Sequence, residues 1–224
     1  MDTAGGTCSA ALWRDGRVVS RRFERLARGH AERLIPMIEA VMGEGDLAYA
    51  DLGCIAVTRG PGGFTGVRIG LAAARGLALA SGRPLVGASN FRVVASAAGA
   101  EAPVDGSLAV VIDAKRSDLY VQAFAADLRP RTEPAALRPE DLADALPPGP
   151  LVLVGDGVEQ AAPYLTAAGR PFALSDAPGS ADAARLAELV ASEGPDAAGG
   201  APVEPLYLRP PDASPAKDIE ARRP

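Results

Sequence analysis

The sequence predicts an α/β protein of two related halves, in which mixed sheets are flanked by helices. Short apolar runs of strand length alternate along the chain with longer runs of helical periodicity, an order typical of sheets covered by helices. Asp2 and Asp113 each stand at the end of a strand position, and each is followed by a polar turn and an alternating strand. We expect these two aspartates to be equivalent points of the two halves.

The composition limits the class of protein. A chain of 224 residues is long enough for one large or two small domains, and a formal net charge of -5 argues against bulk attraction to nucleic acid. Cys8 and Cys54 lie apart in apolar contexts and indicate neither a disulfide framework nor a zinc site. No secretory signal begins the sequence and no apolar run reaches the roughly 20 residues of a membrane span, so we expect a soluble, cytoplasmic protein.

The first elements predict a basic hairpin. Strands are expected over 8–13 and 18–23, with a turn at Asp15 and Gly16. Six arginines lie from Arg14 to Arg28, and we favour a charged, solvated edge hairpin over an RNA-binding patch.

A helix is expected over 32–42, and His30, the single histidine, stands just before it. A catalytic zinc needs about three protein ligands, and a single histidine gives no support for such a site. We therefore expect His30 to be buried or to begin the helix. The apolar spacing of the helix gives it one hydrophobic face. This face carries Leu34, Met37, Ile38 and Val41.

The central stretch, residues 57–80, reads as a strand, a glycine-rich loop and a helix with Thr65 as its N-cap. A phosphate-binding loop of the Walker type is excluded, because no Lys-Ser or Lys-Thr follows the last glycine. A dinucleotide-binding loop is disfavoured, because no acidic residue follows the next strand, over 83–87. The loop consists of Gly60, Pro61, Gly62, Gly63, Phe64, Thr65 and Gly66.

The helix after this loop is rich in small residues. Each interior glycine costs about 1 kcal/mol relative to alanine, which indicates close approach to a neighbour. One small-residue face could pack on the sheet, and the other on a second helix or another subunit. Burial of both faces in the core of this chain is an equally supported alternative. The second face carries Ile69, Ala73, Gly76 and Ala80.

The second half follows the same order of elements. We expect a helix over 90–100, strands over 108–112, 119–124 and 151–154, a proline-rich connector over 127–150, and helices from 158 and over 181–192. The proline-rich, charged end should be disordered. The expected units are an N-terminal domain over 1–100 with docking helices, a smaller C-terminal domain over 101–208, and a tail over 209–224.

The run GPGGFTGVRIGLAAARGLA, which begins at Gly60, resembles the signature of the TsaB (YeaZ) family. The likeness extends over nearly the whole chain, and only Gly63 departs from the signature, where the family has serine. The family also has an apolar strand running into the first aspartate, where this sequence has Met1. Further similar segments are Asp2-Thr3-Ala4, residues 30–36, Ile112-Asp113-Ala114, Gly155-Asp156-Gly157 and residues 206–211.

The resemblance implies two RNase H-like halves of the sugar kinase, actin and chaperone ATPase (ASKHA) superfamily. It also implies a non-catalytic subunit that pairs with a catalytic TsaD-like subunit, is joined by a TsaE-like ATPase, and supports threonylcarbamoyl transfer to N6 of adenosine 37 of tRNA. The tRNA would be met only through the complex, and a homodimer is an alternative for the chain alone. The implied docking surface is Leu34, Met37, Ile38, Val41, Ile69, Ala73, Gly76 and Ala80.

The nucleotide site of that superfamily is incomplete in this sequence. The first aspartate turn leaves room for phosphate oxygens, but the second lacks glycine and carries Lys115 and Arg116. We therefore predict a pseudo-enzyme with no catalytic residue, no metal and no cofactor of its own, with ATP or ADP and magnesium entering only in the complex. The vestigial site comprises Asp2, Gly5, Gly6, Thr7, Asp113, Gly155 and Gly157.

Two alternatives remain. An active small ATPase or kinase of this fold would place Asp2, Thr7 and Asp113 around magnesium and would bind ATP tightly. A direct tRNA-binding module would use the arginines of 14–28 with Lys115 and Arg116, and its affinity would fall steeply with salt.

Overall fold

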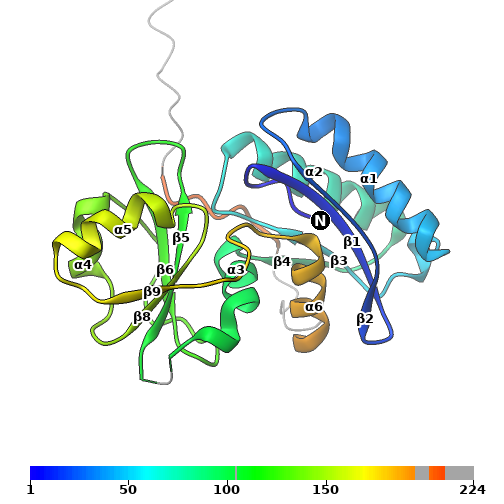
Figure 1. Cartoon of the computed structure of the whole chain (residues 1–224). Coiled ribbons are helices and arrows are strands. Elements are labelled where there is room, and N and C mark those ends of the chain that lie inside the picture. Colours follow the sequence, from blue (N-terminus) through cyan, green and yellow to red (C-terminus); the bar gives the residue numbers. More distant parts are fainter. Residues whose placement is uncertain (104, 195–201, 210–224) are drawn as a thin grey trace, which may run out of the picture.

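The computed structural model describes residues 1–103, 105–194 and 202–209 of the chain. Two sheet regions lie side by side, with α3 and α6 between them (Figure 1). Among the described residues, no helix is long and apolar enough to cross a membrane.

The first half contains two separate two-stranded sheets. The antiparallel hairpin turns at Asp15 and Gly16, whose φ angles of 52° and 82° give the left-handed turn that matches strand twist. The second sheet is a parallel pair joined through a helix. These elements are β1 (Thr7–Arg14), β2 (Arg17–Arg25), α1 (His30–Gly45), a short 3₁₀ helix (Tyr49–Asp51), β3 (Ile55–Thr58), α2 (Phe64–Ser81), β4 (Leu85–Ala88) and α3 (Asn90–Ala98).

The second half is one mixed sheet of five strands in the order β7-β6-β5-β8-β9. The central strand, β5, is antiparallel to β6 and parallel to β8, and α4 and α5 cover the sheet face turned away from α3 (Figure 1). Its elements are β5 (Ser107–Asp113), β6 (Leu119–Phe124), β7 (Ala135–Leu137), α4 (Leu142–Ala145), β8 (Leu151–Val154), α5 (Val158–Ala167) and β9 (Phe172–Leu174), with 3₁₀ turns at Gly99–Glu101 and Pro139–Asp141.

The last described elements return to the first half. Helix α6 (Ala183–Glu193) packs on β1, β2 and β3, and residues 202–209 run along α2, where Arg75 donates to the carbonyl of Val203 at 2.7 Å. Elements late in the sequence thus complete the first half, and the domain division at residue 100 stays a prediction. The predicted disordered tail lies, beyond residue 209, outside the described residues.

The predicted strands and helices are present, with differences at their ends. Helix α2 begins at Phe64 with Gly63 as its N-cap, so the prediction that Thr65 is the N-cap is wrong by two residues. No side chain caps this end, because the N-cap residue, Gly63, has none. The three-residue strands β7 and β9 were not predicted, since each is too short to show a period.

Candidate functional site

The Asp2 turn is closed by the chain's own hydrogen bonds. The Asp2 side chain is fully buried, and its Oδ1 accepts from Thr58 Oγ1 at 2.5 Å, Asn90 Nδ2 at 3.2 Å and the Ala4 amide at 3.3 Å. Thr7 Oγ1 donates to the second carboxylate oxygen at 3.4 Å. The carboxylate is therefore a structural hub that joins the amino end, β3 and α3.

Burial shifts the pKa values of the two ionisable groups at this hub. Removal from water raises the pKa of Asp2, although the hydrogen bonds from Thr58, Ala4 and Asn90 oppose the change. The neighbouring ammonium of Met1 is also buried, which lowers its pKa to about 6. Asp2 lines neither the cleft beside the signature loop nor the cavity between β1 and β3.

The signature loop packs backbone against backbone on the segment that follows Asp2. A Cβ at Gly62 would collide with the carbonyl of Ala4, and one at Gly66 with the carbonyl of Thr3. The Gly63 amide donates to Ala4 at 2.7 Å, and Thr3 Oγ1 donates to the Gly66 carbonyl at 2.7 Å. The glycines of the loop thus permit the loop to approach residues 3–4 closely. The contact of Thr3 with this loop was not predicted from the sequence.

The remaining residues of the loop and of the first turn include both exposed and buried positions, since Gly60 and Pro61 are buried. Gly5, Gly6, Phe64 and Thr65 are exposed, and His30 begins α1 with its Nε2 3.2 Å from the Gly5 carbonyl. Gly60 takes a φ of +96°, and its amide donates to Asn90 Oδ1 at 3.0 Å, so Asn90 ties this loop to the Asp2 hub. Pro61 follows through a cis peptide bond.

The Asp113 turn carries its own cation. Lys115 Nζ donates to Asp113 Oδ2 at 2.8 Å, while the Lys115 amide donates to Oδ1 at 2.7 Å. Burial alone would raise the pKa of Asp113, but these hydrogen bonds oppose it and hold the pKa below its usual range. The Asp113 carboxylate thus has the ammonium of Lys115 as a partner within its own turn.

Asp156 completes this turn. Its Oδ1 accepts from the Asp113 amide at 2.9 Å, and its Oδ2 lies 3.9 Å from Lys115 Nζ. Burial raises the pKa of Asp156. Gly155 and Gly157 allow this approach, because a Cβ at either would meet the backbone at the end of β5. Asp156 is a carboxylate between two glycines at the end of a strand, a pattern visible in the sequence, but its contact with the Asp113 turn was not predicted.

A cleft of about 750 Å³ lies between the signature loop, the Asp113 turn and residues 206–209. The guanidinium of Arg68 stacks on Phe64, 3.6 Å from the ring centroid, and its Nε donates to the Tyr207 hydroxyl at 3.0 Å. Lys115 and Arg209 also line the cleft, but each has a carboxylate partner. Neither Asp2 nor Asp113 lines it, and the described residues contain no group of three potential metal ligands of the His, Cys, Asp or Glu type.

The predicted docking residues fall into two groups. The four on α1 are buried in the core against β1, so their spacing reflects packing inside the molecule. On α2, Ile69 and Ala73 pack partly against the same core, whereas Gly76 and Ala80 are exposed. The core residues on α1 are Leu34, Met37, Ile38 and Val41, each between 1% and 6% exposed.

The basic hairpin is partly neutralised by acidic neighbours. Arg21 pairs with Asp182 at 2.6 Å, and Arg22 pairs with Glu44. Arg14 donates to the Gly45 carbonyl at 3.2 Å. These contacts tie the hairpin to α1 and to the start of α6.

The strand order and the pair of aspartate turns define an α/β protein with mixed and paired sheets flanked by helices. Comparison with known proteins narrows this class. Residues 24–181 match the family TsaD, tRNA N6-adenosine threonylcarbamoyltransferase. YeaZ from Pseudomonas aeruginosa superposes with a TM-score of 0.75 at 31% identity, covering 92% of this chain and 97% of that one.

Two sequence relatives agree with this structural likeness. The tRNA threonylcarbamoyladenosine biosynthesis protein TsaB of Escherichia coli is 38% identical over 127 residues, 57% of this chain and 54% of that protein. The uncharacterized protein Rv3421c of Mycobacterium tuberculosis is 34% identical over 217 residues, 96% of this chain and 92% of that protein. The chain belongs to the TsaB (YeaZ) family, and its alignments span about half the length of the curated TsaB relatives. The relatives of Escherichia coli and Bacillus subtilis carry the name tRNA threonylcarbamoyladenosine biosynthesis protein TsaB.

Proposed function

We propose that this chain is a non-catalytic subunit that pairs with a TsaD-like catalytic subunit for threonylcarbamoyl transfer to N6 of adenosine 37 of tRNA. A TsaE-like ATPase joins this pair, and tRNA is met only through the complex. Family membership supports the pathway, because TsaB relatives carry its name and the family match is to TsaD itself.

The ion pair between Lys115 and Asp113 carries the proposal. A magnesium-nucleotide site needs carboxylate oxygens that are free to face the ion and backbone amides that can approach phosphate. Here the Asp113 carboxylate accepts two hydrogen bonds from Lys115, one from its amide and one from its ammonium. The Asp2 carboxylate accepts four hydrogen bonds from within the chain. This arrangement favours a subunit that contributes no nucleophile, base or metal.

The docking face is best sought on the exposed side of α2. Leu79 is 87% exposed, and together with exposed small residues of the same helix it offers an apolar surface that a partner could cover. It lies seven residues after Ala72 and three after Gly76, and Ala80 lies four after Gly76; these three small residues are also exposed. The small residues let a partner helix approach closely, and Leu79 supplies an apolar anchor. We call these four residues the α2 face.

The test is complex formation with the TsaD-like protein of the same organism, measured by size-exclusion chromatography with light scattering. Leu79→Arg should reduce the affinity at least about tenfold, as expected for loss of an apolar anchor. Leu174→Arg is the matched control, because Leu174 is 60% exposed on β9 in the other half. The run of each chain alone also reports whether it forms a homodimer.

Three outcomes would count against the proposal. No complex with the unmodified chain, with or without ATP, would remove the pairing. Equal loss of affinity in both variants would move the interface away from the α2 face. ATP hydrolysis by the chain alone, lost on Asp113→Asn, would replace the scaffold with the active ATPase.

A further inference from the structure

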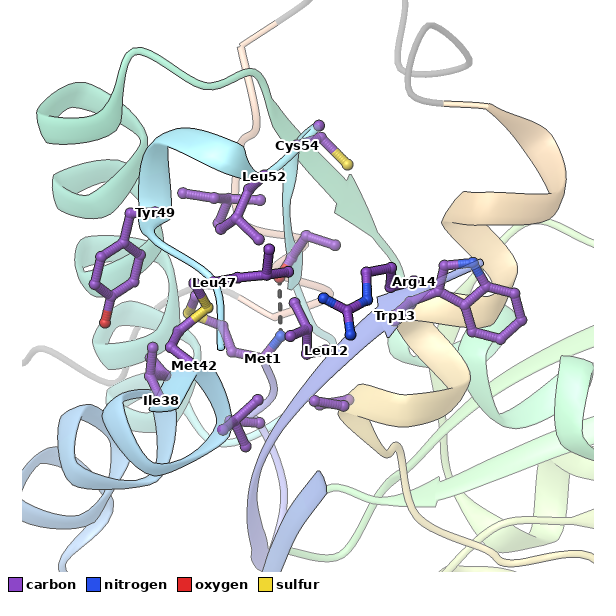
Figure 2. Close-up of a pocket in the computed structure, with 18 of the residues that line it drawn as sticks. Met1, Leu12, Trp13, Arg14, Ile38, Met42, Leu47, Tyr49, Leu52 and Cys54 are labelled. Atoms are coloured by element: carbon purple, nitrogen blue, oxygen red, sulfur yellow. Dashed lines mark hydrogen bonds between the residues drawn. The ribbon is translucent and has the colours of Figure 1, made fainter. Parts of the chain in front are cut away.

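Two cavities among the described residues differ in charge. The cavity of about 420 Å³ between β1 and β3 is lined mainly by apolar side chains, among them Leu12, Met42 and Leu52 (Figure 2). The cleft of about 750 Å³ beside the signature loop is lined by four cationic residues and by no acidic residue. In a chain whose formal net charge is -5, this lining favours an anionic occupant. The four cationic residues are Arg68, Lys115, Arg116 and Arg209.

Arg68 differs from Lys115 and Arg209 in its partners. Lys115 pairs at 2.8 Å with a carboxylate of its own turn, and Arg209 pairs at 3.1 Å with Asp118. Within the described ranges of the chain, Arg68 forms no ion pair, and its Nε donates to the Tyr207 hydroxyl at 3.0 Å. The side chain of Arg68 is exposed, so its two Nη groups can donate to a ligand in the cleft.

Aromatic rings hold the Arg68 guanidinium in place. Its Cζ lies 3.6 Å from the Phe64 ring centroid and 5.9 Å from the Tyr207 ring centroid, and the two centroids are 5.3 Å apart. A guanidinium held in this way loses little conformational entropy on binding, and its paired donors match the two oxygens of a carboxylate. Phe64 is 41% and Tyr207 39% exposed, so the same site also offers an apolar surface.

The site continues the α2 face toward the cleft. Arg68 precedes Ala72 by four residues and Leu79 by eleven, and all three are exposed on one side of the helix. At the rise of an α-helix, Arg68 and Leu79 are about 16 Å apart along the axis, a distance that one interface of ordinary size spans. A partner that covers the α2 face therefore also reaches the Arg68 side of the cleft.

We propose that the cleft receives a segment of the partner subunit that carries a carboxylate next to an apolar side chain. This inference rests on the proposed pairing of the two subunits. The carboxylate accepts two hydrogen bonds from the Arg68 guanidinium, and the apolar side chain packs on the Phe64 and Tyr207 rings. Because Lys115 and Arg209 already have carboxylate partners, the cleft suits the single charge of a carboxylate better than the several charges of a polyphosphate.

The test measures the Kd of the full chain for the TsaD-like subunit of the same organism, by titration calorimetry at about 0.05 M and about 0.5 M salt. Arg68→Ala removes the anchor, Arg68→Lys keeps the charge without the planar donor pair, and Arg68→Glu reverses the charge. Arg185→Ala is the matched control, because Arg185 is an exposed arginine of α6 whose partner, Glu188, lies on the same helix. Thermal unfolding of each variant checks that the fold is kept.

Arg68→Ala should weaken the complex by about tenfold or more, and Arg68→Lys should recover only part of the loss. Arg185→Ala should leave the Kd within about twofold. The loss on Arg68→Ala should be larger at low salt, because salt screens an ion pair. Arg68→Glu should prevent binding, and changing one carboxylate residue of the partner to lysine should restore it. Testing the partner's exposed Asp and Glu residues one at a time identifies that carboxylate.

The outcomes separate this inference from the proposed pairing. If Arg68→Ala left the Kd unchanged while Leu79→Arg weakened the complex, the carboxylate contact would be overturned and the pairing would stand. If the unmodified chain formed no complex, both would be overturned. An Arg68→Ala loss that appeared only with ATP present would assign the cleft to a nucleotide instead. Loss of self-association without loss of the complex would assign it to a second copy of this chain.

Discussion

The ammonium of Lys115 lies 2.8 Å from the Asp113 carboxylate, inside the turn that ends the central strand of the second sheet. This pair gives the turn an internal counter-ion. Its strength can be measured through the pH dependence of stability.

Replacing Lys115 by Met should raise the pKa of Asp113. A carboxyl whose pKa is lowered by folding contributes stability above the unfolded value of 3.8, and this contribution is lost as the pH falls through the folded value. The parent chain should therefore lose more stability than Lys115→Met between about pH 5 and pH 3. Carbon-13 titration of the Asp113 carboxyl, with urea unfolding at each pH, checks this. An unchanged pKa would mean that the pair is not formed in solution.

Asp2→Ala should destabilise the fold by about 3 kcal/mol, because it leaves the buried Thr58 hydroxyl and Asn90 amide without an acceptor. Asp2→Asn is the matched control, since its carbonyl can accept the same bonds. Because burial raises the pKa of Asp2, the parent chain, unlike the Asn variant, should gain stability from this site as the pH falls toward 3.8. Urea unfolding measures both effects, and equal stability of the two variants at pH 7 would contradict the hub.

Gly66→Ala should cost about 2 to 4 kcal/mol, because the new Cβ would meet the carbonyl of Thr3. Gly76→Ala in the same helix is the control, since a Cβ there has nothing within 4 Å and should stabilise by about 0.5 to 1 kcal/mol. Chemical denaturation of both variants gives the difference. If the two changes had the same sign, close approach would not explain the signature glycine.

The isolated chain should bind tRNA only weakly, with a Kd of about 10⁻⁴ M or higher at physiological salt. The reason is that much of its positive charge is paired, as in Arg21 with Asp182 and Lys115 with Asp113. Fluorescence anisotropy at two salt concentrations measures the affinity and its slope. A steep slope that Arg68→Ala reduces would instead support direct tRNA binding in the cleft beside Phe64.

The local sequence pattern predicted most of the helices and strands, but it did not predict which residues pack against them in the fold. The spacing of Leu34, Met37, Ile38 and Val41 correctly indicated one apolar face, yet periodicity cannot distinguish a face that packs on the chain's own β1 from one that awaits a partner. The glycines of the signature loop were recognised, but their contact surface, Thr3 and Ala4, is distant in sequence.

The Asp2 hub shows the same limit. Thr58 and Asn90 donate to the carboxylate across sequence separations of 56 and 88 residues. Neither residue belongs to a local sequence motif from which its contact with Asp2 could be predicted. Only the folded topology brings them together. By contrast, the equivalence of Asp2 and Asp113 rests on local order alone, since each ends a strand position and is followed by a polar turn and an alternating strand, and it stays a prediction.

The return of α6 to the first sheet has a consequence for the order of assembly during synthesis. The Ala183 amide donates to Ser9 Oγ at 2.9 Å, across a separation of 174 residues. Until the ribosome has made residues 183–193, the face of β1 that α6 covers in the folded protein cannot be covered by that helix. The second half is contiguous and can fold before that face is closed, so the part of the protein made first is completed last.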